Sequence, residues 1–289
     1  MAMKRRRADL PLILITSFLI LWGLIVLFPF YNAVLISLVP MDVYYKTPIL
    51  LYPKSATLLS YIHILNWRNL LSGFKNTLFV LLVGTTYNVI LTTLTAYALT
   101  KNIPGKSVFK GIIIFTMFFG GGLLPFYLLI VNMHLVNSLW AMVLPSGVSI
   151  FNLLLMQSYY RTLPDEFEES ARIDGAGELT ILFRIVLPLC KPMLATITLY
   201  YAVDRWNEWY NGMLFMQKTA KWPLQLFIRN MLSDAAMILQ AVPASQRVSI
   251  FSEGMKMAAI VITMTPIICV YPFLQKYFVK GITLGGVKG

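Results

Sequence analysis

The segment EESARIDGAG, from Glu168 to Gly177, is followed by ILFRIVLPLCKP, from Ile181 to Pro192. Together they form a charged island between two long apolar stretches. Carboxylates crowd the start of this island, where exposed backbone N–H groups and the helix dipole favour negative charge. Arg172 stands four residues after the first of these, Glu168, at the spacing of a helical ion pair. The island therefore predicts a polar helix that is too short and too charged to cross a membrane.

A turn and a second helix are expected after this first one. Gly175 tolerates the positive φ that a chain requires where a helix ends in a tight turn. A second short amphipathic helix is predicted from about Glu178 to a point before Pro188. Residues 158–190 are therefore predicted to form a helix-turn-helix at the membrane surface.

Several positions of this loop follow a known pattern. They are Glu169, Ser170, Ala171, Gly175, Ile185, Leu187 and Pro188. The pattern resembles the EAA loop of permease subunits in binding-protein-dependent ABC importers. Ser170 stands where that family usually has alanine, but both side chains are small, so close packing is retained. The flanking sequence is most similar to the maltose-type permeases of the carbohydrate-uptake branch.

The resemblance implies that the loop is a coupling helix, inserted into a cleft of a separate ATP-hydrolysing subunit. The residues expected to couple this chain to that ATPase are Glu168, Glu169, Ser170, Ala171, Arg172, Asp174 and Gly175. Two ATP-binding subunits, a second homologous permease and an extracytoplasmic solute-binding protein are the implied partners. ATP and Mg²⁺ would be held by the ATPase subunits, and this chain is expected to bind no cofactor or metal.

Composition predicts an all-α integral membrane protein. Of the 289 residues, 58% are apolar, and the mean hydropathy of +0.71 lies far outside the range of soluble domains. The net charge of +12 comes from basic residues spread over loops, without a dense basic and aromatic patch. Membrane orientation explains this charge better than a nucleic-acid partner does.

The chain is predicted to be a single transmembrane permease domain, residues 1–289, with six spans. The spans are expected at about residues 10–38, 76–100, 108–131, 138–156, 192–215 and 255–272. Gly120–Gly122 and Pro125 interrupt the third span, as in a translocation path or a close helix contact. Residues 67–77 and 223–240 are expected to form surface helices.

Basic residues predict the orientation of the chain. With the N-terminus inside, the short inner segments carry a denser positive charge than the long outer loops. Both termini and the coupling loop are therefore placed in the cytoplasm. The resemblance implies that the spans lie in a bacterial plasma (inner) membrane. The resemblance covers residues 74–289, and the first span fits by position only. It also implies that the basic tail, residues 280–289, reaches the ATPase dimer, unless this tail is a disordered end.

The stretch YYAVDRWNEWYNG, residues 200–212, brings charges into the fifth span, where each costs about 2.5–3.5 kcal/mol on insertion scales. Arg205 is the expected partner of Glu208, three residues later. Helical spacing predicts one polar stripe made of Tyr200, Tyr201, Asp204, Asn207, Glu208 and Asn211. With Arg205, this stripe either walls an aqueous path for a sugar or joins the helix to another subunit. WNEW resembles the Trp-Asn-acid segment of carbohydrate permeases, which favours the path.

The sequence lacks a GxxxxGK loop and an HExxH motif, so a transporter subunit is expected rather than an enzyme. The expected function is import of an oligosaccharide from an extracytoplasmic binding protein into the cytoplasm by alternating access. Basic outer segments suit an acidic, uronic-acid cargo, whereas two carboxylates beside one arginine in the stripe suit a neutral one. A stand-alone ion-coupled secondary transporter using Asp204 and Glu208 is the alternative, although it leaves the EAA pattern unexplained.

Overall fold

The computed structural model describes residues 10–47, 50–233 and 251–282, with side chains up to Val270 in the last range. The described residues are helical and contain no strand, which confirms the all-α prediction. The chain divides into two compact units. Unit 1 comprises Met1–Trp67 and Asn230–Thr265, and unit 2 comprises Arg68–Arg229 and Pro266–Gly289. Each unit is described by itself.

The expected number of six membrane spans is not confirmed. Within the described residues, three helices are long and apolar enough to cross a membrane, namely α1 (Leu10–Ser37), α4 (Arg68–Ala98) and Ser252–Val270 of α16 (Ser252–Ile282). Two bent helix pairs raise the number to five if each pair is one span. One is α5 (Lys106–Phe118) with α6 (Leu123–Asn132), bent by 114°, and the other joins Glu178–Leu189 to α12 (Lys191–Trp206), bent by 87°.

The predicted interruption of the third span is confirmed, because α5 ends and α6 begins on either side of the glycines. The residues of the fourth and fifth predicted spans do not form continuous helices. The fourth consists of α7 (Trp140–Val143) and α8 (Ile150–Tyr160), and the fifth stops at Trp206 before α13 (Tyr210–Phe215). Pro145 and Gly147 between α7 and α8 explain the first break, since both residues disfavour a helix interior.

Two surface-helix predictions have different outcomes. Residues 67–77 do not form a separate helix, because α4 already begins at Arg68 and runs through them. The second is confirmed by α14 (Leu224–Ser233), while residues 234–240 lie outside the described part of the chain. Of the tail, residues 280–289, residues 283–289 also lie outside it, so the expected contact of the tail with an ATPase stays a prediction.

Unit 1 is built on α1, a helix that is apolar on every side. Its most apolar window has a mean hydropathy of 2.6 and buries none of its residues inside the protein. Such a helix is suited to lipid rather than to a protein core or water. At its end, Ile36 and Val39 pack with Phe251, and α2 (Met41–Lys46) and α3 (Leu59–Leu65) follow.

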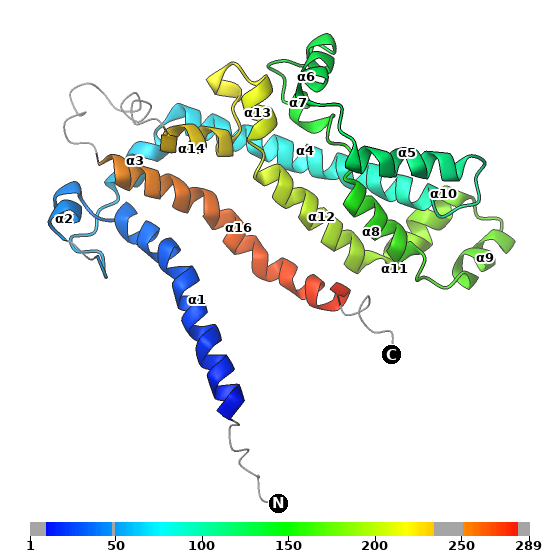
Figure 1. The fold of residues 1–289 in the computed structure, drawn as a ribbon, viewed down its shortest axis with the longest axis horizontal. Coiled ribbons are helices and arrows are strands. Elements are labelled where there is room, and N and C mark those ends of the chain that lie inside the picture. The colour runs from blue at the N-terminus through cyan, green and yellow to red at the C-terminus, as the bar shows by residue number, and fades with distance from the viewer. Residues whose placement is uncertain (1–9, 48–49, 234–250, 283–289) are drawn as a thin grey trace, which may run out of the picture. The chain divides into compact units, whose positions relative to one another are not determined.

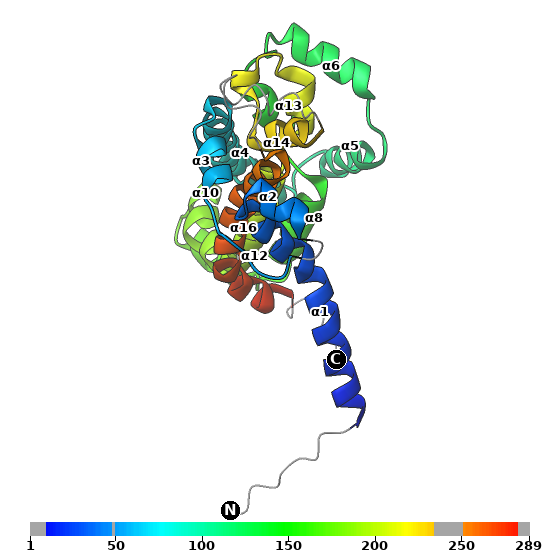
Figure 2. The same cartoon turned by 90° about the vertical axis from the view of Figure 1, so that its left-hand side faces the viewer.

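Unit 2 is organised along α4, which packs against α12, α8 and α7 (Figure 1). At the start of α4, Thr77 accepts a hydrogen bond of 2.8 Å from the backbone N–H of Leu224. Near the same end, Phe126 of α6 contacts Phe215 of α13, and these two helices lie together in Figure 2. At the other end of α4 lie α9 (Glu166–Ile173) and α10 (Glu178–Ile181) (Figure 1). Helix α4 thus extends from the end of the unit that contains α6 and α13 to the end that contains α9 and α10.

Replacing Gly212 with alanine is expected to destabilise unit 2. A Cβ atom at this position of α13 would lie 2.7 Å from Cγ of Pro223, whose ring cannot rotate away. Overpacking of this kind costs about 1–3 kcal/mol. The midpoint of thermal unfolding of the purified protein in detergent should therefore fall. Gly111→Ala in α5 is the control, because its Cβ meets nothing within 4 Å. Equal midpoints for the two variants would contradict the packing described for α13.

Candidate functional site

The predicted helix-turn-helix is present within residues 158–190. Helix α9 ends at a Schellman turn, in which the N–H of Ala176 bonds to Ala171 O at 2.9 Å and that of Gly175 bonds to Arg172 O at 3.0 Å. Gly175 has a φ of 81°, which confirms the predicted positive φ at this position. The tight turn therefore depends on a residue without a side chain.

The second helix of the loop is longer than expected. It continues from α10 through the π-helical segment η1 (Leu182–Val186) into α11 (Leu187–Leu189). The predicted end before Pro188 is wrong, because Pro188 is itself a helical residue of α11, which directly follows the π-helical segment. Ile181, Leu182 and Val186 are buried in a core shared with α4, α8 and α12. This arm therefore joins the loop to the membrane helices.

Helix α9 has one buried contact and a largely exposed surface. Ala171 is buried against the core that also contains Ile181. Ile173 is 86% exposed and Leu179 is 65% exposed, and Phe167 is also exposed. Glu169, Ser170, Asp174 and Gly175 are exposed as well. Exposed apolar and charged side chains therefore make up most of the surface of α9.

Glu168 and Arg172 differ from the other predicted coupling residues. Their predicted ion pair is present, with Arg172 Nη2 3.6 Å from Glu168 Oε2. Glu168 also contacts Lys101, which follows α4, and Arg172 lies 2.7 Å from Glu178 Oε1. The carboxylate and the guanidinium thus bind within the chain. The structure brings the seven residues into one loop, and their contact with an ATPase stays a prediction.

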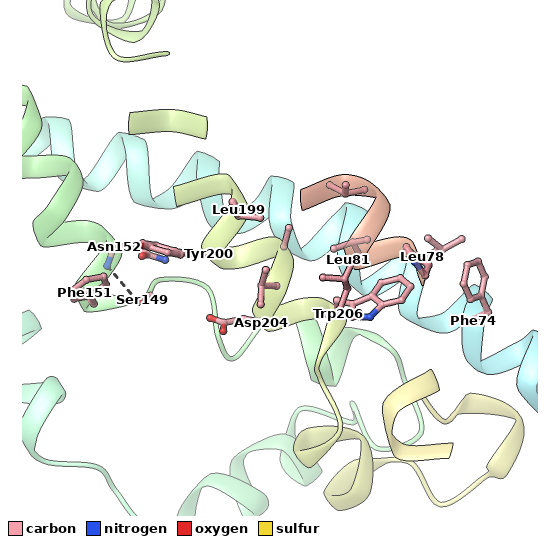
Figure 3. A pocket seen from close by; sticks show the side chains of 15 residues that line it. Phe74, Leu78, Leu81, Ser149, Phe151, Asn152, Leu199, Tyr200, Asp204 and Trp206 are labelled. Carbon is pink, nitrogen blue, oxygen red and sulfur yellow. Dashed lines mark hydrogen bonds between the residues drawn. The ribbon is translucent and has the colours of Figure 1, made fainter. Parts of the chain in front are cut away.

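A pocket of about 770 Å³ lies along α4, α8 and α12 in unit 2. Figure 3 shows the side chains that line it, among them Phe74, Phe151, Tyr200, Asp204 and Trp206. Three residues of α16, from Pro266 onward, complete the lining. A mainly apolar wall with a few polar groups is typical of pockets that bind organic ligands.

The seven predicted pathway residues fall into three groups. Tyr200 and Asp204 line the pocket, whereas Tyr201 and Arg205 are buried toward α4. The others lie around the break between α12 and α13, and they are Asn207, Glu208 and Asn211. The prediction of one continuous helical stripe is therefore wrong, because the helix that was expected to carry it ends at Trp206.

Glu208 stabilises the new helix that follows this break. Its carboxylate accepts a hydrogen bond of 3.1 Å from the backbone N–H of Asn211 and one of 3.0 Å from the Asn211 side chain. An acceptor at this place satisfies an N–H group that the first turn of a helix leaves unpaired. Asn207 instead bonds back to Val203 O at 2.9 Å. Local hydrogen bonding thus explains why the polar segment starts a second helix.

The expected ion pair between Arg205 and Glu208 is also absent from the described residues. Arg205 is only 4% exposed, and its Nε and Nη2 atoms donate to Asn88 Oδ1 at 2.9 and 2.8 Å. Nη1 bonds to Met142 O, and Nη2 lies 3.2 Å from Val143 O and 2.9 Å from Ser146 O. The carbonyl oxygens at and just after the end of α7 carry partial negative charge and accept these hydrogen bonds. They take the role that was expected of the carboxylate.

Tyr201 ties the same region to α4. Its hydroxyl lies 2.6 Å from Thr92 Oγ1 and accepts a hydrogen bond of 2.9 Å from the N–H of Ser149. Sequence reasoning overlooked Asn88 and Thr92, although two polar residues four positions apart in an apolar helix indicate a buried polar contact. It also overlooked the aromatic wall contributed by Phe74 and Phe151.

Replacing Arg205 with glutamine is expected to lower the stability of unit 2. Glutamine has too few donors for Asn88 and three carbonyls, and each buried group left unsatisfied costs about 1–3 kcal/mol. The midpoint of heat-induced loss of the folded protein in detergent should fall. The exposed Arg184→Gln is the matched control and should leave the midpoint unchanged. A midpoint that does not move in either variant would show that these hydrogen bonds do not support the fold.

Comparisons with known proteins agree with the loop and the fold. Residues 7–284 match the model of the family described as binding-protein-dependent transport system inner membrane component. Protein LplC of Bacillus subtilis is 39% identical over 247 residues, which cover 83% of this chain and 81% of LplC. The polygalacturonan/rhamnogalacturonan transport system permease protein YtcP of the same organism is 34% identical, with 99% of this chain and all of YtcP covered.

A solved structure is similar as well. One chain in the crystal structure of a bacterial ABC transporter involved in the import of the acidic polysaccharide alginate has a TM-score of 0.86 and 31% identity. The alignment covers 96% of this chain and all of that one. The resemblance of the loop is thereby confirmed, and a transporter component rather than an enzyme is indicated. This chain belongs to the family of binding-protein-dependent transport system inner membrane components, the permease subunits of ABC importers.

Proposed function

We propose that this chain is the transmembrane subunit of an ATP-driven importer that takes an oligosaccharide of the uronic-acid class from an extracytoplasmic binding protein. The observation that carries the proposal is its similarity, over nearly the whole chain, to a permease chain of an importer of the acidic polysaccharide alginate. YtcP, named for polygalacturonan and rhamnogalacturonan transport, supports the same class of cargo. Alternating access would release the cargo into the cytoplasm of a bacterium.

Coupling to ATP hydrolysis is assigned to the loop of residues 158–190. Phe167, Ile173 and Leu179 are exposed and suit an apolar cleft on a separate ATPase, with Glu169 at the edge for a basic partner. ATP and Mg²⁺ belong to two such ATPase subunits. A second homologous permease and a solute-binding protein complete the proposed assembly, and both termini of this chain lie on the cytoplasmic side with the loop.

The pocket along α12 is proposed as part of the cargo path. Phe151, Tyr200 and Trp206 offer aromatic faces for sugar rings, and Asp204 and Asn152 offer hydrogen bonds to hydroxyl groups. Arg205 is engaged by Asn88 and the carbonyls of the α7 end, so it is not proposed to bind a cargo carboxylate. Basic outer segments, which include Lys218 and Lys221, would raise the encounter rate of an acidic cargo instead.

Asp204 restricts the orientation in which an acidic cargo can occupy the pocket. A carboxylate in the pocket repels the carboxylates of uronic acids, so the cargo is expected to present its hydroxyl groups to Asp204. The alternative of an ion-coupled secondary transporter required Asp204 and Glu208 to act together. Only the first of these two lines the pocket, and Glu208 is occupied by Asn211. That alternative is therefore not favoured.

Cargo preference can be measured with the complex and its binding protein in proteoliposomes. Acidic oligosaccharides should be taken up in preference to neutral ones of matched length. Asp204→Asn should raise the ratio of acidic to neutral uptake several-fold, because it removes a repulsive charge from the path. Asp42→Asn, the same change in α2 of unit 1, should leave the ratio unchanged. Wild-type uptake of neutral oligosaccharides alone would refute the acidic cargo class.

Coupling is tested by Gly175→Val. A β-branched residue at a φ of 81° is strained, at a cost of about 1–2 kcal/mol, so the turn that presents α9 should distort. Transport and cargo-stimulated ATP hydrolysis should fall together while the protein stays in the membrane. Gly177→Val is the matched control, because Gly177 has a φ of −73° and open space around it. Normal transport by the Gly175 variant would remove the loop from the proposal.

A further inference from the structure

Four charged side chains close a ring at the end of α4. Lys101 contacts Glu168 and lies 3.5 Å from Glu178 Oε2. Arg172 lies 3.6 Å from Glu168 Oε2 and 2.7 Å from Glu178 Oε1. Each charge thus has two neighbours of opposite sign. We name these four residues the loop clasp, because Lys101 follows α4, Glu168 and Arg172 belong to α9, and Glu178 begins α10.

The clasp is anchored on the membrane helices at Lys101. The ammonium lies 4.1 Å from the centroid of the Tyr97 ring, and the Tyr97 hydroxyl donates a hydrogen bond of 2.9 Å to Glu178 Oε2. Tyr97 itself is buried and contacts Tyr160 of α8, with ring centroids 6.0 Å apart. The amide of Gln157 in α8 donates to Leu99 O at 2.9 Å. Lys101 therefore projects from an end of unit 2 that aromatic packing and hydrogen bonds hold together.

The environment favours the charged forms of Lys101 and Glu178. The side chains of Lys101 and Glu168 are only 18% and 26% exposed. Burial opposes the charge of Lys101, but hydrogen bonds to Glu168 and Tyr97 outweigh it and raise the pKa of the ammonium. Burial also opposes the charge of Glu178, yet the Tyr97 hydroxyl, Lys101 and Arg172 lower its pKa. Single exposed ion pairs contribute little, whereas a partly buried ring with two partners for each charge resists reorientation.

The rest of the attachment of α9 is small. Ala171 is the residue of α9 that is buried in the core, and most other side chains of this helix are exposed. A methyl group can hold two helices in contact, but it does not define the angle between them. The clasp adds polar contacts next to Ala171 and connects α9 directly to the end of α4. It thus meets the requirement for passing a movement from one helix to another.

We propose that Lys101 is a positioning residue for energy coupling, which holds α9 at a defined angle to α4 through Glu168, Arg172 and Glu178. The inference rests on the proposed coupling function of the loop. It assigns different roles to Glu168 and Glu169, which the sequence analysis had both assigned to coupling with the ATPase. Glu168 belongs to the internal linkage, whereas the exposed Glu169 remains available to the ATPase.

Loss of the clasp and loss of ATPase binding should affect the ratio of cargo transported to ATP hydrolysed differently. A variant without the clasp keeps the exposed surface of α9, so the ATPase still binds and hydrolyses ATP, but movement of α9 reaches α4 incompletely. Cargo transported per ATP hydrolysed should then decrease. A variant that weakens ATPase binding, such as Glu169→Lys, should lower hydrolysis and transport together and leave that ratio unchanged. The ratio therefore separates positioning from binding and from simple loss of folded protein.

The experiment measures cargo uptake and ATP hydrolysis by the reconstituted complex in proteoliposomes. Lys101→Met should lower the cargo-to-ATP ratio several-fold, and Lys101→Arg should retain most of it. Glu178→Gln breaks the ring at its more exposed carboxylate. It therefore provides a second variant if Lys101→Met does not assemble. Lys106→Met is the matched control, since Lys106 bonds to Thr100 O at 3.2 Å and lies outside the clasp.

A double-mutant cycle completes the test. Lys101→Met with Glu168→Gln should lower the ratio no further than the stronger single variant, because residues that act through each other are not additive. An unchanged ratio in Lys101→Met and Glu178→Gln, or additive losses in the cycle, would overturn the inference. Those results would leave the coupling function of the loop intact if Gly175→Val still lowered transport and ATP hydrolysis together. Normal transport by Gly175→Val would instead refute the proposed function itself.

Discussion

The guanidinium of Arg205 forms the contact on which the arrangement of unit 2 depends. A buried charge is costly unless its hydrogen bonds are satisfied. Here Asn88 of α4 and the carbonyls of Met142, Val143 and Ser146 satisfy them. The same bonds provide donors for backbone groups that the break between α7 and α8 leaves without helical partners. One side chain thus makes possible a broken helix beside α4 and holds α12 next to both.

This contact also determines which face of α12 is available to cargo. Successive residues of a helix point about 100° apart, and residues four apart share a face. Because Tyr201 and Arg205 are directed toward α4, their neighbours Tyr200 and Asp204 point into the pocket. Gly84 contributes by having no side chain, since a Cβ there would lie 3.0 Å from Nε of Arg205. Structural support and the proposed path therefore use alternate faces of one helix.

The loop at the other end of α4 combines apolar and charged contacts. Its second arm is buried with the core of the unit, while α9 holds to it through Ala171 and the loop clasp. A helix with few buried contacts can be moved by a partner, and a rigid arm can pass that movement on. Such a device fits the proposed function, in which this subunit responds to ATP hydrolysis in a separate chain.

The sequence alone determined the features that depend on neighbouring residues. The membrane class follows from long apolar runs, the turn at Gly175 from its missing side chain, and the pair of Glu168 and Arg172 from one helical turn. The break at Gly120–Gly122 was visible for the same reason. The motif of the loop was specific enough to indicate the family, although not the number of spans.

Only the tertiary structure decided which distant groups meet. Arg205 was assigned to Glu208 because that carboxylate is near in sequence, whereas its partners Asn88 and Met142 lie 117 and 63 residues away. The contact of Lys101 with Glu168 joins residues 67 positions apart and likewise could not be predicted from the sequence. A polar pattern shows that a buried side chain needs partners, but packing of separate helices selects them. Every residue has a backbone carbonyl, so the sequence cannot show which carbonyls accept hydrogen bonds from an arginine.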